Sequence, residues 1–124
     1  MITANLNTYR QSPRKVRLVS NLVKGKSIPD ALRILSVTTK AAALPLRKLL
    51  LSAVRSAKNS WSIDEANLYV KDFRVDAGAT LKRSMPRARG SAFQILKRTC
   101  HVSLVLDERN AVKSEKSKVK SQNL

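Results

Sequence analysis

The stretch Lys82-Arg83-Ser84-Met85-Pro86-Arg87-Ala88-Arg89-Gly90 lies at the centre of a longer segment, residues 77–106, that contains no acidic side chain. Its flanks, Leu68 to Asp76 and Thr99 to Leu106, have the apolar and β-branched content of strands. The segment between them, residues 77–98, is therefore most simply one hairpin that extends far beyond its sheet. Legs of about 11 residues, at roughly 3.3 Å per residue, would place the tip about 35 Å from the sheet.

An extended arm of this kind has no interior of its own to bury. Ordering it costs on the order of 1 to 2 kcal/mol per residue, which contacts with a partner must offset. Because the arm is strongly cationic, its composition favours a partner that carries phosphate.

Composition supports the same partner. The 124 residues carry a formal net charge of +17, and 43% are hydrophobic but only 4% aromatic. The length suits one domain, with a thin core of Leu, Val, Ile and Ala. Self-repulsion at this charge disfavours a compact independent monomer, and a polyanion would relieve it. Nucleic acid is the leading partner.

Other classes fit the sequence less well. No run approaches 18 apolar residues, and residues 1–5 lack the regions of a signal peptide, so we expect no membrane association. Cys100 is the only cysteine, which excludes an internal disulfide and a cysteine zinc site. We expect no cofactor, no metal and a reducing compartment.

The charges are also segregated along the chain. Residues 1–29 and 31–63 contain cations and no acid, whereas the acids are confined to Asp30, the 64–76 region and the tail from Asp107. An ordinary soluble domain intersperses both signs. Broad contact with a folded RNA explains this distribution better than one narrow patch.

Ser12-Pro13 predicts the start of a helix, and Gly25 predicts its end. Basic residues around the first turn oppose the helix dipole, which suggests that an anion binds at that end. The structural alternative is a solvated helix end. The buried stripe is expected to comprise Val16, Val19 and Val23, widened by Leu18 and Leu22.

Ser27 as cap and Asp30 at the third position predict a second, short helix. A third should run to about Ser60, with either a kink at Pro45 or a start near Leu44, because proline removes a backbone hydrogen bond. Its expected buried residues are Leu46, Leu49, Leu50, Ala53 and Ala57, and its expected outward cations are Arg47, Lys48, Arg55 and Lys58.

Strand signals follow period two. Cys100, Val102, Leu104 and Leu106 share one face of the last strand, and Leu68 to Asp76 changes parity, which a bulge or burial on both faces would reconcile. Residues 2–9 could supply a third strand. The predicted fold is α+β: three helices packed on a small antiparallel three-stranded sheet, with a long extended β-hairpin. Residues 1–107 should form one RNA-binding domain and residues 108–124 a basic, disordered tail.

Four stretches together resemble one family: SPRKVRLV at 12–19, LVKGK at 22–26, KRSMPRARG at 82–90 and ILKRT at 95–99. Their order and spacing are similar to those of the bacterial-type large-subunit ribosomal protein twenty-two family, over about residues 4–107. Ser91 and Gln94 stand where that family commonly carries arginines, and Trp61 replaces a small or polar loop residue.

The resemblance implies a structural constituent of the large ribosomal subunit that binds and helps assemble its RNA. Implied partners are large-subunit ribosomal RNA, neighbouring large-subunit proteins and, transiently, the nascent polypeptide, with no homo-oligomer. The implied location is the cytoplasmic ribosome, with an organellar ribosome as the alternative. Expected RNA-binding residues are Arg10, Arg14, Lys15, Arg17, Lys24, Lys26, Lys82, Arg83, Arg87, Arg89, Lys97 and Arg98. The implied exit-tunnel tip is Met85, Pro86, Arg87, Ala88, Arg89, Gly90 and Ser91.

Two other functions fit the sequence less well. An enzyme that cleaves phosphodiesters needs clustered carboxylates, and residues 64–65, Asp72 and Asp76 before and along a strand are the only candidates. His101 has no second histidine, and Cys100 has core parity. A DNA-bending architectural protein would also use a basic arm, but it would normally dimerise. The sequence therefore favours a non-enzymatic ribosomal RNA-binding protein.

Overall fold

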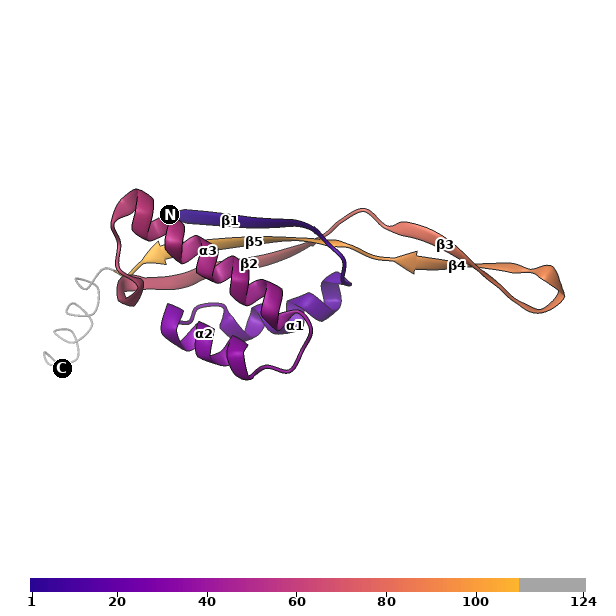
Figure 1. Ribbon diagram of the computed structural model, residues 1–124, viewed down its shortest axis with the longest axis horizontal. Coiled ribbons are helices and arrows are strands. Elements are labelled where there is room, and N and C mark those ends of the chain that lie inside the picture. Colours follow the sequence, from indigo (N-terminus) through magenta and orange to yellow (C-terminus); the bar gives the residue numbers. More distant parts are fainter. Residues whose placement is uncertain (110–124) are drawn as a thin grey trace, which may run out of the picture.

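The computed structural model describes residues 1–109, and the predicted tail beyond Arg109 lies outside the described residues. Three helices accompany a three-stranded sheet in the order β1-β5-β2 and a two-stranded sheet β3-β4, which confirms the predicted α+β class (Figure 1). The elements are β1 (Ile2–Tyr9), α1 (Pro13–Val23), α2 (Ile28–Val37), α3 (Ala43–Trp61), β2 (Leu68–Ala77), β3 (Leu81–Pro86), β4 (Ala92–Lys97) and β5 (Cys100–Glu108), with short 3₁₀ turns at Glu65–Asn67 and Ala88–Gly90.

Strand β5 is the centre of the larger sheet and pairs antiparallel with both neighbours. The register with β2 shifts between Val70 and Asp72, which is the bulge that the sequence offers as one of two alternatives. It explains the change of parity, because Val70 before the shift and Phe73 after it are both buried. One bulge therefore keeps the apolar residues of β2 on the core side.

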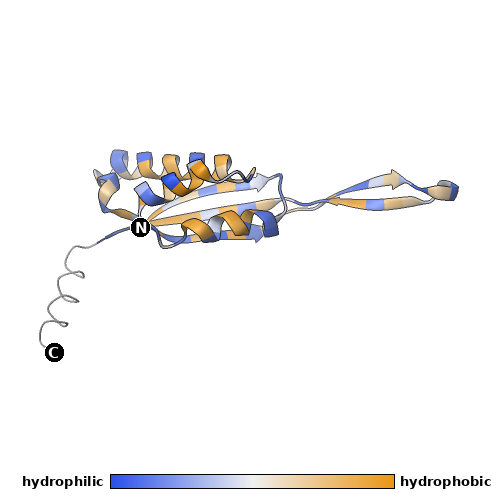
Figure 2. Ribbon diagram, turned by 90° about the horizontal axis from the view of Figure 1, so that it is seen from below, coloured by the Kyte–Doolittle hydropathy of each residue, from blue (hydrophilic) through white to orange (hydrophobic). Residues whose placement is uncertain are grey.

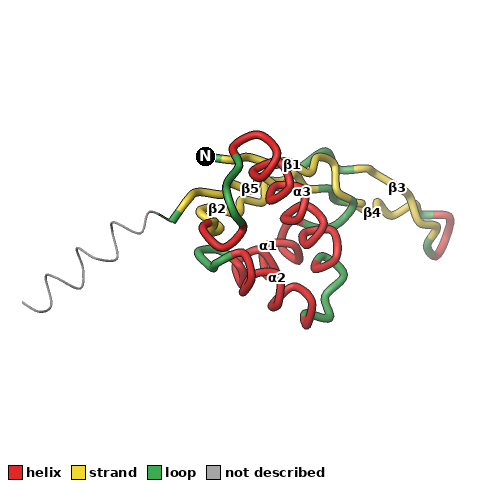
Figure 3. Tube along the Cα trace, turned by 60° about the vertical axis from the view of Figure 1, so that its left-hand side comes forward, coloured by secondary structure: helices red, strands yellow, loops and turns green. Residues whose placement is uncertain are grey.

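The hydrophobic core lies between this sheet and the helices, which cover one of its faces (Figures 1 and 3). The predicted inward face of β5 is confirmed, since its alternate apolar residues are fully buried. So is the set expected on α3. The buried residues of β5 are Cys100, Val102, Leu104 and Leu106.

Helix α1 has a narrower buried stripe than the sequence predicts. Val16, Val19 and Val23 are fully buried, but Leu18 is 64% exposed and Leu22 is 50% exposed. At about 100° per residue, Leu22 lies roughly 90° and Leu18 roughly 130° around the helix from the centre of the valine stripe. Their predicted burial is wrong, because α1 contacts the core through the valine side alone.

Helix ends follow the sequence signals with one exception. Ser27 Oγ accepts a hydrogen bond from the Asp30 amide at 3.4 Å and donates one to Asp30 Oδ2 at 2.6 Å. Helix α3 begins at Ala43, so Pro45 lies in its first turn, where no backbone amide needs a partner. Ser12 occupies the N-cap of α1, but its side chain makes no capping hydrogen bond.

The hairpin β3-β4 continues the β2-β5 pair beyond the sheet, as predicted for residues 77–98 (Figure 1). Between the two ladders lies a neck, residues 78–80 and 98–99. There the Gly78 amide donates to the Thr99 carbonyl at 2.9 Å, and Thr99 Oγ1 donates to the Ala79 carbonyl at 2.6 Å. Thr99 is 3% exposed, so these bonds fix the neck out of contact with water.

Gly78→Ala should lower the free energy of unfolding by about 1 to 3 kcal/mol, because overpacking a close contact carries a cost of this size. A Cβ at Gly78 would lie 2.5 Å from Thr99 Oγ1 and 3.3 Å from the Thr99 carbonyl carbon. Urea denaturation of the free protein measures the change. Ala77→Val, on an exposed residue just before the neck, is the control and should change stability little.

The double variant Gly78→Ala with Thr99→Ala tests the cause of that loss. Since Thr99→Ala removes the atom that the new Cβ would meet most closely, the combined change should cost less than the sum of the two single changes. Strict additivity would show that the threonine hydroxyl is not what restricts residue 78.

Candidate nucleic-acid interface

A basic cleft lies where the hairpin leaves the core. It encloses about 510 Å³, and it joins the end of β1 and the start of α1 to the end of β4. It contains four cations from two distant parts of the chain and, among the described residues, no carboxylate. Its lining residues are Arg10, Gln11, Ser12, Lys15, Leu96, Lys97 and Arg98. Phosphate groups are the ligands that such a concentration of charge attracts.

Gln11 is a member of this cleft that the sequence interpretation missed. Its Oε1 atom is buried and has no hydrogen-bond partner among the described residues. Burying an amide oxygen without a hydrogen-bond donor costs free energy. Rotating the Gln11 amide by 180° exchanges its oxygen and its NH₂ group, so that the NH₂ group takes the buried position. An anion in the cleft would give that NH₂ group an acceptor. A lone glutamine carries no pattern by which the sequence could reveal this.

The first turn of α1 extends the basic surface. Arg14 and Lys15 are exposed and, with Ser12 and Leu18, line a shallow concavity of about 310 Å³ beside the cleft. The first turn contains no acidic residue, and the Ser12 side chain leaves the helix amides uncapped. The positive end of the helix dipole therefore adds to the field of these side chains.

Three other cations predicted to bind RNA lie elsewhere, and the side chains of two of them have roles within the fold. Arg17 Nε donates to the Val75 carbonyl at 3.0 Å and so ties α1 to β2. Lys24 Nζ lies 2.7 Å from Asp72 Oδ1, and this hydrogen bond lowers the pKa of the Asp72 carboxyl. The Lys26 carbonyl accepts from the Val70 amide at 2.9 Å, while its side chain lies in a different pocket. These three residues lie outside the basic cleft.

Along the hairpin, Lys82, Arg83, Arg87 and Arg89 are all exposed. Within residues 1–109 there are four ion pairs, and none involves the hairpin; they join Lys24 to Asp72, Arg33 to Asp30, Lys71 to Asp107 and Arg74 to Asp76. The positive charge of the arm is thus not neutralised by the described part of the chain.

The tip is a short loop on a regular ladder. Met85 and Pro86 still pair with Phe93 and Ala92, so the reversal itself spans residues 87–91. The Arg87 amide donates to the Ser91 carbonyl at 2.8 Å, and Arg89 and Gly90 take positive φ values of 59° and 71°. The predicted tip, residues 85–91, therefore comprises this loop and the two β3 residues that form the last two cross-strand pairs before it.

A further basic groove runs along α3. It encloses about 360 Å³, lined by Lys48, Leu51, Ser52, Arg55, Ser56 and Asn59. The sequence predicts that these cations face outward, which is confirmed, but it does not single them out as an interface. The spacing of Lys48, Ser52, Arg55 and Asn59 by three or four residues places them on one helix face, and this pattern could have indicated the groove.

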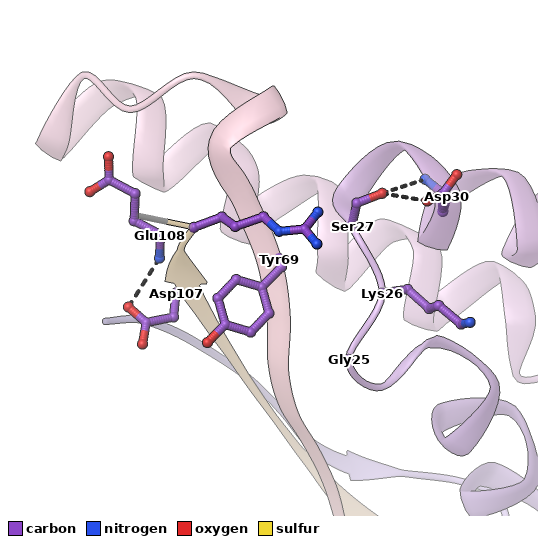
Figure 4. Close-up of a pocket in the computed structure, with 8 residues that line it drawn as sticks. Gly25, Lys26, Ser27, Asp30, Tyr69, Asp107 and Glu108 are labelled. Atoms are coloured by element: carbon purple, nitrogen blue, oxygen red, sulfur yellow. Dashed lines mark hydrogen bonds between the residues drawn. The ribbon is translucent and has the colours of Figure 1, made fainter. Parts of the chain in front are cut away.

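Three of the carboxylates, those of Asp30, Asp107 and Glu108, lie together at the opposite end of the sheet (Figure 4). A pocket of about 590 Å³ there is lined by Gly25, Lys26, Ser27, Asp30, Tyr69, Asp107, Glu108 and Arg109. The hydrogen bond from Lys71 lowers the pKa of the Asp107 carboxyl. Because carboxylates repel phosphate, this pocket is less suited to nucleic acid than the basic cleft.

The described residues offer little for catalysis. Asp72 and Asp76 are engaged in ion pairs, and burial raises the pKa of the Cys100 thiol, which disfavours a reactive thiolate. Across residues 1–109, no cluster of three or more His, Cys, Asp or Glu side chains is placed to hold a metal ion. In the same range, none of the helices combines the length and apolarity that crossing a membrane requires.

Comparison with known proteins places the chain in a family. The sequence model described as "Ribosomal protein L22p/L17e" matches residues 4–107. A protein of Lactobacillus delbrueckii subsp. bulgaricus named large ribosomal subunit protein uL22 is 50% identical over 107 residues, which cover 86% of this chain and 92% of that protein. The protein of the same name from Acetivibrio thermocellus is 52% identical over 107 residues, 86% of each chain. The chain therefore belongs to the ribosomal protein L22p/L17e family and is a structural, non-enzymatic protein of the large ribosomal subunit.

Proposed function

We propose that the chain binds large-subunit ribosomal RNA through the basic cleft, the first turn of α1 and the hairpin, and that the hairpin tip reaches the polypeptide exit tunnel. The cleft carries the first part of this proposal. It brings Arg10 and Lys15 together with Lys97 and Arg98 at the point where the arm leaves the core. A phosphate backbone that entered there would hold both the core and the base of the arm.

The shape of the arm supports the second part. Within residues 1–109, strands β3 and β4 pair with each other, and the hairpin projects from the core (Figure 1). Such an arm is ordered at lowest cost inside a partner, with its unneutralised cations against RNA. The tip loop, residues 87–91, would then lie deepest in the subunit. There it would contact the nascent polypeptide. The core would contact neighbouring ribosomal proteins, and each cytoplasmic ribosome would contain one copy of the chain.

Sedimentation of cell lysate through a density gradient at moderate salt tests whether the chain is held by the large subunit. We expect it to co-migrate with that subunit, and to crosslink to large-subunit RNA under ultraviolet light. Migration with free protein or with DNA would contradict the proposal.

Arg14→Glu combined with Lys15→Glu should weaken binding to the RNA by about tenfold or more, since two phosphate contacts become repulsive. The circular dichroism spectrum of the free protein should stay nearly unchanged, because acids suit the first turn of a helix. Filter binding and circular dichroism measure the two effects.

Arg33→Glu with Lys40→Glu, the same charge change on and just after α2, is the matched control and should weaken binding less. Loss of helicity in the Arg14 and Lys15 variant would show that these residues act in folding instead.

A further inference from the structure

Phe93 is an exposed aromatic residue on the hairpin, in a chain with few aromatics. The residue is 57% exposed, and its cross-strand partner Met85 is 44% exposed. The Arg87 guanidinium carbon lies 5.5 Å from the centre of the ring, within cation–π range. No described residue buries this group, so an apolar ring that costs free energy in water is presented outward beside a cation.

The pairing register gives the hairpin two unlike faces. Side chains of residues directly opposite in an antiparallel ladder lie on the same face. One face carries the pairs Leu81 with Lys97, Arg83 with Ile95 and Met85 with Phe93, and the other carries Lys82 with Leu96, Ser84 with Gln94 and Pro86 with Ala92. The first face, here called the Phe93 face, combines large apolar groups with cations. Figure 2 shows hydrophilic and hydrophobic residues interspersed along both strands.

We propose that Phe93 is a stacking platform for an unpaired base of large-subunit ribosomal RNA. This rests on the proposed function, in which the arm lies in RNA. Aromatic rings and arginine planes are the groups on which proteins stack splayed-out bases. Arg87 fixes the ring through its cation–π contact, so the platform exists before RNA binds.

Cations beside the ring can hold the rest of a nucleotide. Arg83 lies on the Phe93 face, one cross-strand pair of that face away from Met85 and Phe93, and the Arg87 guanidinium lies over the ring. A base stacked on Phe93 would place its flanking phosphates within reach of these two arginines. A nearby concavity of about 260 Å³ takes most of its lining, Lys82, Ser84, Ala92 and Gln94, from the opposite face. A π face and two cations together match a base with its phosphate.

A nascent peptide is the competing occupant, and the charge pattern disfavours it. The Phe93 face holds Arg83 and Lys97, which a mostly neutral peptide does not need and an RNA strand does. The opposite face, with Ser84, Gln94 and Ala92, has smaller and less charged groups near the tip and suits a passing peptide. The two faces are therefore divided between RNA and the tunnel interior.

Chemical probing of RNA in large subunits that carry Phe93→Ala as the sole copy tests the platform. We expect one or a few unpaired nucleotides to become about fivefold or more reactive, the shift that loss of a stacked aromatic produces. Phe93→Tyr should restore the low reactivity, because it keeps the ring. Leu96→Ala, on the opposite face at 43% exposure, is the matched control and should leave these nucleotides unchanged.

Unchanged reactivity in Phe93→Ala subunits that contain the protein at full occupancy would overturn the platform. So would a photoreactive phenylalanine analogue at position 93 that crosslinks to a stalled nascent chain and not to RNA. Failure of the proposed function is a separate result: the unaltered protein would then leave no footprint on large-subunit RNA at all.

Discussion

Affinity for a large-subunit RNA fragment is expected to fall by roughly three to five decades as monovalent salt rises from about 50 to 200 mM. A fall of this size corresponds to about 6 to 10 neutralised phosphates. The basic cleft supplies four cations, and the exposed arm adds Lys82, Arg83, Arg87 and Arg89. Since no carboxylate in residues 1–109 forms an ion pair with the arm, these charges are free to displace counterions from RNA.

Filter binding over a salt series measures the slope of the logarithm of affinity against the logarithm of salt concentration. The matched variant Lys97→Gln with Arg98→Gln should reduce this slope by about two, because each lost phosphate contact removes about 0.9. A nearly flat response of the unaltered protein would mean that phosphate contacts do not dominate binding.

Reversing the charge at the base of the hairpin, with Lys97→Glu and Arg98→Glu, should weaken RNA binding by about 100-fold or more. Both side chains line the cleft, where they meet Arg10 and Lys15 from the other part of the chain. Two acids there would repel phosphate and would also pair with those neighbouring cations, so the cleft would lose most of its field. Incorporation into large subunits should fall accordingly.

The measurement is the amount of each variant in purified large subunits when it is expressed beside the unaltered protein. Both residues are exposed, so the free variant should keep its thermal stability, and a normal melting curve excludes misfolding as the cause. Equal incorporation of the variant and the unaltered protein would show that the cleft is not an RNA-binding site.

Much of the fold could be predicted because local signals and global packing agree. Ser27 with Asp30 predicts one helix start, and the structure contains it. For Pro45 and for the parity change in β2 the sequence leaves two solutions each, and the structure contains one of them, a helix start at Ala43 and a bulge. The exposure of Leu18 and Leu22 could not be predicted, since helical periodicity gives the apolar side of α1 but not the width of the surface that it meets.

The candidate site was predicted by charge and not by geometry. Positive residues could be found from the sequence, but whether each one binds within the fold or lines the cleft depends on its tertiary neighbours. Arg17 donates a hydrogen bond to a strand carbonyl, whereas Lys15 lines the cleft together with Lys97 and Arg98. The division of the hairpin into two faces depends on its register, which the loop at residues 87–91 sets. That register places Phe93 on the same face as Met85 and Arg83, which the sequence alone does not show.

Crosslinking from the hairpin tip to a stalled nascent chain tests most directly whether the arm reaches the exit tunnel. Ser91→Cys places a thiol in the tip loop, and Ser52→Cys places one on the exposed groove of α3. The native Cys100 is fully buried and should not react. With a nascent chain that carries one cysteine and a short thiol-reactive crosslinker, we expect a crosslink from Ser91→Cys and none from Ser52→Cys. A crosslink from Ser52→Cys alone, or from neither variant in fully occupied subunits, would contradict the account.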